Sequence, residues 1–300
     1  MTARAEGNPG ARLRALLRRE RILVAPGAFN ALNARLIERA GFEAVYMSGA
    51  GTVAALTALP DIGLLSATEM ALNARYIAGA VRVPVFADAD TGYGNAVNVM
   101  RTVREYERAG LAGLHLEDQV APKRCGHVAG KECVPLAEMV GKIRAAVAAR
   151  SDPDFVIIAR TDARAPFGFD EAVRRGRAYA GAGADVVFPE ALETRDEFAA
   201  YARAVEAPLL ANMAEFGRTP YLSAGEFEAL GYRIVIFATS GLRVATRVME
   251  QFYAELRGRG TQTGWLDRMT TRAQLYDVID YPRYTEFERE FVDDARDPLA

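Results

Sequence analysis

One short stretch of the chain, HLEDQVAPKRCGHVAGKEC at residues 115–133, holds the residues best suited to acid–base chemistry. It contains both cysteines, both histidines and two of the three lysines of a chain that otherwise uses arginine for its cations. Cys125 lies between Lys123-Arg124 and Gly126-His127. Cationic neighbours favour a thiolate and an adjacent histidine can shuttle a proton, so the spacing predicts a reactive thiol. The alternative is a chance surface cysteine, and Cys133 is predicted to be structural.

Acidic residues follow two neighbouring apolar runs. Asp88 and Asp90 alternate in ADADTGYG, and Glu117 ends the next run. Three carboxylates at one edge of a sheet repel one another unless a cation lies among them, and hard oxygen ligands suit Mg2+ or Mn2+. The trio predicts a divalent-metal site, although helix capping or ion pairing would explain any one of the acids alone.

Two arginines at or beyond strand ends predict an acidic substrate. A guanidinium grips a carboxylate through two parallel hydrogen bonds, and both Arg160 and Arg243 are placed for this, with surface ion pairs as the alternative. Together with Glu190 and Asn212 they indicate a substrate with more than one carboxylate. The glycine-rich turn SGAGT at residues 48–52 offers backbone N–H groups to an oxyanion.

Two further segments resemble nucleotide- or phosphate-binding motifs but lack essential features of them. GAGTVA resembles a dinucleotide fingerprint, but Pro60 follows too soon for the long helix that this motif must open. GHVAGKE lacks the spacing and the Ser/Thr of a phosphate loop. Nucleotide binding is therefore not expected.

Composition excludes several classes of partner. The 300 residues are 50% hydrophobic and 25% charged, with a net charge of -2. The basic residues are scattered, which gives no case for a nucleic-acid or membrane partner. The amino terminus lacks a signal peptide's apolar core and no apolar run reaches about 18 residues, so a cytoplasmic location is expected. Two cysteines predict no disulfide framework.

Eight apolar runs alternate with segments of helical periodicity, as in NVMRTVREYERAG. This pattern predicts a (β/α)8 barrel of the TIM type, with a doubly wound open sheet as the alternative. We expect an extension at residues 1–20, the barrel at 21–258 and a helical, aromatic-rich tail at 259–300. Catalytic side chains of such barrels lie where the strands end, and the polar residues named above lie there.

The motifs EDQVAPKRCGH, YMSGAGT, LPDIGLLS, ADADTGYGNA, IIARTDA, FPEA and LLANMAEFGRTP make the chain similar to the isocitrate lyase and phosphoenolpyruvate mutase superfamily. It most resembles the 2-methylisocitrate lyase-like branch, from about residue 20 to 292. The resemblance implies a barrel whose last helix is exchanged with a neighbouring subunit, in a homotetramer built as a dimer of dimers.

The resemblance also implies roles for single residues. Asp88 binds Mg2+, with Asp61, Asp90 and Glu117 arranged around it largely through water. The remaining roles are a keto-acid site at Tyr46, Ser48, Gly49 and Ala50, with Arg160 on its carboxylate; a clamp on the second product at Glu190, Asn212 and Arg243; and a mobile catalytic loop of Lys123, Arg124, Cys125 and His127, with Cys125 the general acid.

The implied reaction is cleavage of a carbon–carbon bond in a 2-hydroxy di- or tricarboxylic acid such as 2-methylisocitrate. It yields pyruvate or a related keto acid plus a dicarboxylate such as succinate. Some segments, among them SGAG, DADTGYG and IFATSG, are closer to other relatives. The alternatives are a carboxyphosphonoenolpyruvate or phosphonopyruvate mutase, a 2,3-dimethylmalate lyase, an oxaloacetate hydrolase or a non-catalytic barrel.

Overall fold

The structure, a computed structural model, describes residues 7–128 and 130–293. Position 129 of the loop, the first six residues of the predicted extension and the last seven of the predicted tail lie outside these ranges. The chain divides into two compact units, Met1–Arg243 and Val244–Ala300. Within the described ranges, no helix has both the length and the apolar character that a membrane span requires.

All eight predicted strands form, and each lies, to within one residue, inside the apolar run that predicted it. A short, continuous apolar run favours a parallel strand that is buried on both faces. The strands are β1 (Leu23–Ala28), β2 (Val45–Met47), β3 (Val85–Asp88), β4 (Gly113–Glu117), β5 (Val156–Thr161), β6 (Val186–Pro189), β7 (Leu210–Asn212) and β8 (Ile234–Phe237).

The strands form a nearly closed barrel, so the barrel prediction is confirmed and the open sheet is not found. All pairs are parallel, in the order β6-β5-β4-β3-β2-β1-β8-β7. A parallel bridge between Val187 and Leu209 joins β6 to β7, supported by a 2.9 Å hydrogen bond from the Val187 N–H to the Pro208 carbonyl. The carboxyl ends of all eight strands therefore meet at one mouth.

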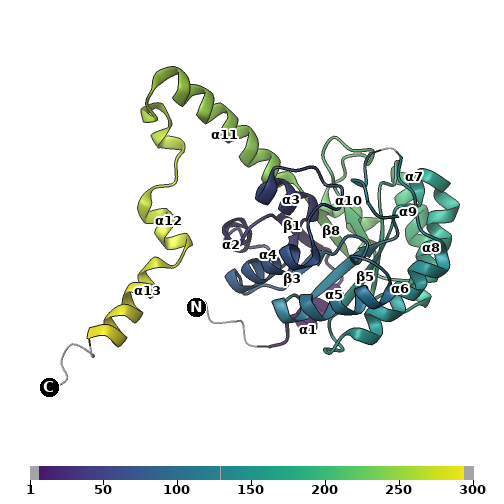
Figure 1. Cartoon of the computed structure of the whole chain (residues 1–300). Helices are drawn as coiled ribbons and strands as arrows, with labels where there is room; N and C mark the ends of the chain where they lie inside the picture. Colours follow the sequence, from purple (N-terminus) through teal and green to yellow (C-terminus); the bar gives the residue numbers. More distant parts are fainter. Residues whose placement is uncertain (1–6, 129, 294–300) are drawn as a thin grey trace. The chain divides into compact units, whose positions relative to one another are not determined.

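Helices between the strands surround the barrel (Figure 1). Several begin at a side-chain cap, such as the reciprocal capping box between Ser66 and Glu69. The helices of the first unit are α1 (Pro9–Leu17), α2 (Ala31–Arg39), α3 (Gly49–Thr57), α4 (Ala67–Ala80), α5 (Ala96–Ala109), α6 (Leu136–Ala149), α7 (Arg164–Phe167), α8 (Phe169–Gly181), α9 (Arg195–Ala204), α10 (Ala224–Ala229) and the start of α11 (Ser240–Arg259).

The interior of the barrel is apolar toward its amino-terminal end, where α1 contributes to it. Leu13 of this helix is fully buried in one cluster with the inward-facing Ile158 and Ile236. Gly10 permits the close approach, since a Cβ there would lie 2.6 Å from the Asp154 carbonyl oxygen. An apolar core at this end leaves the opposite, carboxyl-terminal mouth for polar chemistry.

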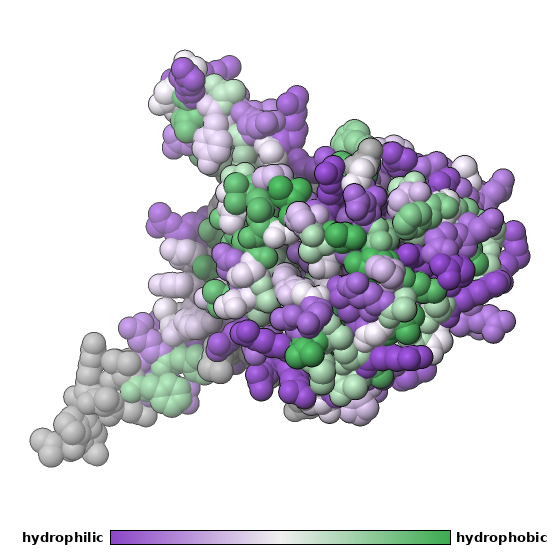
Figure 2. Space-filling view, turned by 45° about the vertical axis from the view of Figure 1, so that its right-hand side comes forward, coloured by the Kyte–Doolittle hydropathy of each residue, from purple (hydrophilic) through white to green (hydrophobic). Residues whose placement is uncertain are grey.

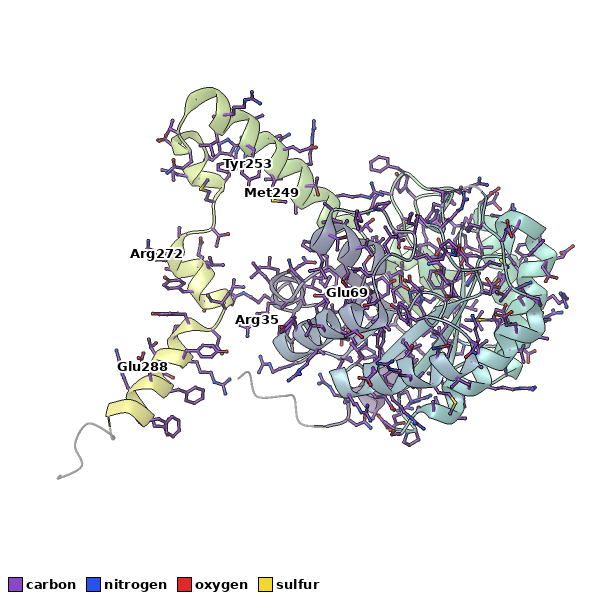
Figure 3. All side chains as sticks on the ribbon, viewed as in Figure 1. Arg35, Glu69, Met249, Tyr253, Arg272 and Glu288 are labelled. Carbon is purple, nitrogen blue, oxygen red and sulfur yellow. The ribbon has the colours of Figure 1, made fainter. Side chains whose placement is uncertain are left out.

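The second unit is helical and leaves many apolar residues exposed. It contains the rest of α11, followed by η1 (Thr263–Arg268), α12 (Arg272–Val278), α13 (Tyr281–Glu288) and η2 (Arg289–Asp293). Trp265 is buried beside Phe252 and donates a 2.8 Å hydrogen bond to Glu255. Met249 and Tyr253, labelled in Figure 3 one turn apart on α11, are 47% and 61% exposed.

The first unit also exposes large apolar residues. On the face drawn in Figure 2, hydrophobic residues gather in patches between charged ones. Exposed leucines and an isoleucine lie at the end of α3 and in its connection to α4, at Leu56, Leu59, Ile62 and Leu64. Patches of this kind commonly mark contact surfaces between proteins.

Candidate active site

Alternate residues of β2, β3 and β4 form the floor of the carboxyl-terminal mouth. Side chains alternate across a strand, so His115 and Glu117 both face the interior, near Tyr46 and Asp88. Tyr46 Oη lies 2.8 Å from His115 Nε2, and that nitrogen lies 3.7 Å from Asp88 Oδ1. Burial lowers the pKa of His115 to about 4, so the imidazole is uncharged at neutral pH.

The glycine-rich turn after β2 lies directly against this floor. Ser48 caps α3, and its Oγ accepts a 3.0 Å hydrogen bond from the Gly51 N–H. Gly49 packs so closely on the Asp88 carboxylate that no Cβ would fit. The N–H groups of Gly49 and Ala50 lie in the first turn of α3, where no carbonyl of the helix can accept them. The structure thus brings the predicted oxyanion turn beside Asp88.

The four acids expected around a metal lie at this mouth, with Lys123 among them. Lys123 Nζ is 2.5 Å from Asp61 Oδ1 and 3.0 Å from Asp90 Oδ1. Both carboxylate oxygens of Glu117 are buried without a hydrogen bond. Over the described part of the chain, no three His, Cys, Asp or Glu side chains converge into a ready set of metal ligands.

The mouth carries an excess of negative charge. Burial, reinforced by Asp88 and Asp61, raises the pKa of Asp90 to about 6 despite the nearby Lys123. Burial likewise raises the pKa of Glu117 well above its usual value. A hard divalent cation that takes one or two carboxylates and keeps several waters fits these oxygen donors and offsets their charge. The buried Glu117 carboxylate, which accepts no hydrogen bond, is the clearest sign of that fit.

Arg160 lies at the centre of the mouth, surrounded by acids. Its Nε and Nη2 donate to the two oxygens of Asp162 at 2.9 and 3.1 Å. Its guanidinium also lies 3.4 Å from Glu117 Oε2 and 3.4 Å from Glu190 Oε2, and 5.2 Å from the ring of Phe188. These contacts fix the orientation of the guanidinium plane.

Glu190 links β6 to the cysteine loop and to β7. His127 Nδ1 accepts a 3.3 Å hydrogen bond from the Arg218 N–H, so its Nε2 carries the proton and lies 2.8 Å from Glu190 Oε1. Asn212 Nδ2 lies 3.4 Å from both Glu190 oxygens. Burial alone would raise the pKa of Glu190, but the Arg160 guanidinium and the His127 imidazole 2.8 Å away hold it at about 2.

Arg243 is not brought into this group. Its side chain is 50% exposed, lies 3.5 Å from Glu215 Oε2 and donates to Thr239 Oγ1 at 3.1 Å. Its guanidinium also lies 5.5 Å from the centre of the Phe216 ring. Of the predicted clamp on the second product, the structure therefore assembles Glu190 and Asn212, while Arg243 is held by other partners.

The loop that carries Cys125 is tied down at both ends. Gln119 bridges to Cys133, and the Gln119 amide accepts from the Arg124 N–H at 2.9 Å and donates to the Arg124 carbonyl at 2.8 Å. The loop, including Cys125, and residues 60–62 line a cavity of about 620 Å³. The thiol thus faces a space that can hold a small molecule.

The structure does not favour a thiolate at Cys125, although the sequence places cations beside it. Burial raises the pKa of the thiol, nearby carboxylates add to that effect, and the His127 backbone N–H opposes it only in part. Lys123 contacts Asp61 and Asp90, and Arg124 is exposed, so neither cation stabilises a thiolate. Cys125 is instead a protonated thiol at neutral pH, which suits a proton donor.

Sequence reasoning missed residues that support the mouth from below. His115, Gln119, Lys131 and Asp162 had no predicted role, although His115 shares the inward face of β4 with Glu117 and could have been found by the two-residue period. Asp118 points away from the mouth, where it accepts hydrogen bonds from Tyr179 at 2.7 Å and Arg175 at 3.0 Å. Lys131 could not be placed beside Asp162 from the sequence, because the two residues are 31 positions apart. Gln119 and Asp162 have partners nearby in the chain, Arg124 and Arg160, but residue type alone does not single these pairs out.

We predict that Glu190→Gln makes the free energy of unfolding less dependent on pH below pH 4.5. The pKa of Glu190 falls from 4.5 to about 2 on folding, so its ionised form stabilises the protein above pH 4.5 and this stabilisation is lost as pH falls toward 2. The difference in unfolding free energy between wild type and variant should shrink by up to about 3 kcal/mol over that range. Urea denaturation at stepped pH measures it. Glu206→Gln, at an exposed position, is the control. The prediction is contradicted if the difference in unfolding free energy from wild type is independent of pH for Glu190→Gln, as it should be for the control.

Comparisons with known proteins agree with this geometry. The family model for phosphoenolpyruvate phosphomutase matches residues 13–257. A 2-methylisocitrate lyase of Aeropyrum pernix is 49% identical over 97% of this chain and 94% of its own, and a 2,3-dimethylmalate lyase of Eubacterium barkeri is 50% identical over 95% and 98%. A phosphonopyruvate hydrolase solved with oxalate and Mg2+ superposes with a TM-score of 0.87, at 35% identity, over 95% of this chain and 100% of that one. The chain belongs to the phosphoenolpyruvate mutase/isocitrate lyase superfamily.

Proposed function

We propose that the protein is a Mg2+-dependent lyase that cleaves 2-methylisocitrate, or a closely similar 2-hydroxy di- or tricarboxylic acid, into pyruvate and a dicarboxylate such as succinate. One observation carries the proposal: Gly126, next to the protonated thiol of Cys125, lies directly against Arg160 and Glu190, so the loop holds the thiol at the acidic mouth. The 49% identity to a 2-methylisocitrate lyase supports the choice of substrate.

The metal would be held by Asp88, with Asp61, Asp90 and Glu117 arranged around it through water. Mn2+ has the same preference for oxygen ligands and is the alternative ion. When bound, a divalent cation supplies positive charge that stabilises the developing oxyanion of the keto acid. The related phosphonopyruvate hydrolase was solved with Mg2+, which supports the same requirement in this chain.

The keto-acid half of the substrate would bind between the turn and the floor. The N–H groups of Gly49 and Ala50 offer hydrogen bonds to an oxyanion, with Ser48 and Tyr46 beside them. Arg160 would bind the carboxylate of this half. Its Nη1, which does not contact Asp162, lies 3.4 Å from Glu190 Oε2, a distance too long for a good hydrogen bond, so a substrate carboxylate can compete for this nitrogen.

Cys125 would act as the general acid. The substrate hydroxyl gives its proton to solvent and becomes the carbonyl of the keto acid as the adjacent carbon–carbon bond breaks, and the electron pair of that bond remains as a carbanion next to a carboxylate. The Cys125 S–H then delivers its proton to that carbon, and the thiolate left behind is reprotonated from water. A thiol whose pKa is raised by burial keeps this proton until the carbanion forms.

The dicarboxylate half would meet Glu190, Asn212 and His127. Arg243 completes the clamp in this proposal only after it leaves Glu215, and a substrate carboxylate is a suitable replacement for that partner. On the same loop, Lys123 would position Cys125 through its contacts with Asp61 and Asp90, and Arg124 through its backbone hydrogen bonds with the Gln119 amide.

A second candidate substrate is 2,3-dimethylmalate. The chain is 50% identical to a 2,3-dimethylmalate lyase and 49% identical to a 2-methylisocitrate lyase, so sequence identity does not favour either substrate. Both reactions leave a keto acid and a carbanion next to a carboxylate, so the same catalytic residues serve either one. Cleavage of oxaloacetate would also leave a carbanion next to a carboxylate, whereas a phosphonopyruvate substrate would leave Cys125 without a carbanion of this kind to protonate.

A substrate panel tests the proposed function. The protein is incubated with Mg2+ and, separately, 2-methylisocitrate, isocitrate, 2,3-dimethylmalate, oxaloacetate and phosphonopyruvate, and pyruvate or other keto acid is measured by a coupled dehydrogenase. We expect pyruvate and succinate from 2-methylisocitrate, loss of activity in EDTA and recovery with Mg2+ or Mn2+. Reaction of the phosphorus compound alone would refute the lyase assignment.

We predict that Cys125→Ser lowers kcat on the cleaved substrate by about 10²- to 10⁴-fold, because a serine hydroxyl is a far weaker acid. KM should change little, since the thiol acts after binding. Cys133→Ser is the matched control and should keep near wild-type turnover. A Cys125→Ser protein with wild-type kcat would exclude the thiol as the proton donor.

The tail is proposed to pack on a neighbouring subunit in a homotetramer. Its exposed apolar side chains, Leu275, Ile279, Tyr284 and Phe291 among them, support this, because an unpaired helical unit would not leave such residues in water. We predict that Tyr284→Lys shifts the protein toward smaller species in sedimentation velocity, whereas Arg257→Ala does not. A Tyr284→Lys protein with unchanged assembly would contradict this role of the tail.

A further inference from the structure

Lys131 is a buried cation on the return half of the cysteine loop. Its side chain is fully buried, and its Nζ donates to Asp162 Oδ1 at 2.7 Å and to the carbonyl oxygen of Gly126 at 2.5 Å. A buried ammonium without a partner destabilises a protein, so the loop conformation that buries Lys131 is stable only while Lys131 is paired with Asp162. The position of the loop and the pairing of this charge are therefore linked.

Asp162 is a rigid anchor for that contact. Its N–H donates to Asp118 Oδ1 at 2.8 Å, and its carboxylate accepts from Arg160 at 2.9 and 3.1 Å. Burial alone would raise the pKa of Asp162, but Arg160 and Lys131 hold it well below its usual value. Asp162 therefore stays ionised, fixed from three sides and joined to the guanidinium that faces the substrate.

The carbonyl that Lys131 binds belongs to the residue between Cys125 and His127. Gly126 lies tightly on the floor, since a Cβ there would lie 2.5 Å from Arg160 Nη2 and 2.6 Å from Glu190 Cγ. Lys131, which binds the Gly126 carbonyl, and Arg160, which lies in the floor, thus both pair with the Asp162 carboxylate. A shift of Gly126 would carry the thiol and the imidazole with it.

We propose that Lys131 is a positioning residue for catalysis, which acts through Asp162 and the Gly126 carbonyl to hold the Cys125 thiol over the substrate. This inference rests on the proposed function of Cys125 as proton donor. The contrary view is an ion pair that only stabilises the fold. The two views differ in what happens to the thiol when the ammonium is removed.

Lys131→Met tests the proposal in a Cys133→Ser background, which leaves Cys125 as the single thiol. Alkylation of the free enzyme by iodoacetamide, followed by mass spectrometry, should be about tenfold faster than in the parent, because the released loop exposes the thiol. With substrate, kcat should fall about 10- to 100-fold while KM changes less than about threefold, since a displacement of about 1 Å has this effect on a catalytic group. Lys131→Arg, which keeps the cation, should recover part of both.

Lys142→Met is the matched control. Lys142 is also a buried lysine, and its Nζ donates to a carbonyl, that of Thr91, at 3.2 Å. This variant should lose comparable thermal stability but alkylate within about threefold of the parent. Lys131→Gln, which keeps a donor without the charge, gives the same comparison if Lys131→Met does not fold.

An alkylation rate in the Lys131 variants within about twofold of the parent would overturn the proposal, whatever the turnover. Equal acceleration in Lys142→Met would overturn it too, because loss of any buried lysine would then loosen the loop. Accelerated alkylation specific to Lys131 in a protein that cleaves none of the panel would support the loop anchor and refute the proposed function, so the two failures are distinguishable.

Discussion

The charge of Arg160 is the constraint on which the mouth of the barrel depends. The guanidinium is 10% exposed and lies among Asp162, Glu117 and Glu190, which are 0%, 0% and 1% exposed. Charges buried this deeply are tolerated only when each has a partner. Asp162 has two cationic partners, whereas Glu117 has only a contact of 3.4 Å. This imbalance leaves one carboxylate available to a metal and one edge of the guanidinium available to a substrate.

The same charges determine the chemical state of the cysteine loop. A loop rich in lysine, arginine and histidine would favour a thiolate in water, but each cation here is directed at an acid of the barrel or at solvent. Lys123 contacts Asp61 and Asp90, and His127 contacts Glu190. The thiol is left in a partly buried and negative surrounding that keeps it protonated. The cationic residues therefore place the loop, and the acids of the barrel set its reactivity.

The fold could be predicted almost entirely from sequence, because each strand is a short apolar run and each run is followed by helical periodicity. The site could be predicted in part. Residues at strand ends, such as Asp88, Glu117, Arg160 and Glu190, follow from the geometry of a parallel barrel. Arg243 could not be placed from the sequence, because nothing in it shows that this side chain contacts Glu215 and Phe216, which lie far from it along the chain.

By itself, the sequence determined which strands form, which residues end them and that one loop concentrates the acid–base chemistry. These properties are local, and they follow from periodicity and residue type. Only the tertiary structure decided which charges meet: Lys131 with Asp162 across 31 positions, and His127 with Glu190 across a longer separation. Protonation and pairing depend on burial and on distances of a few ångströms, and neither quantity exists until the barrel has closed.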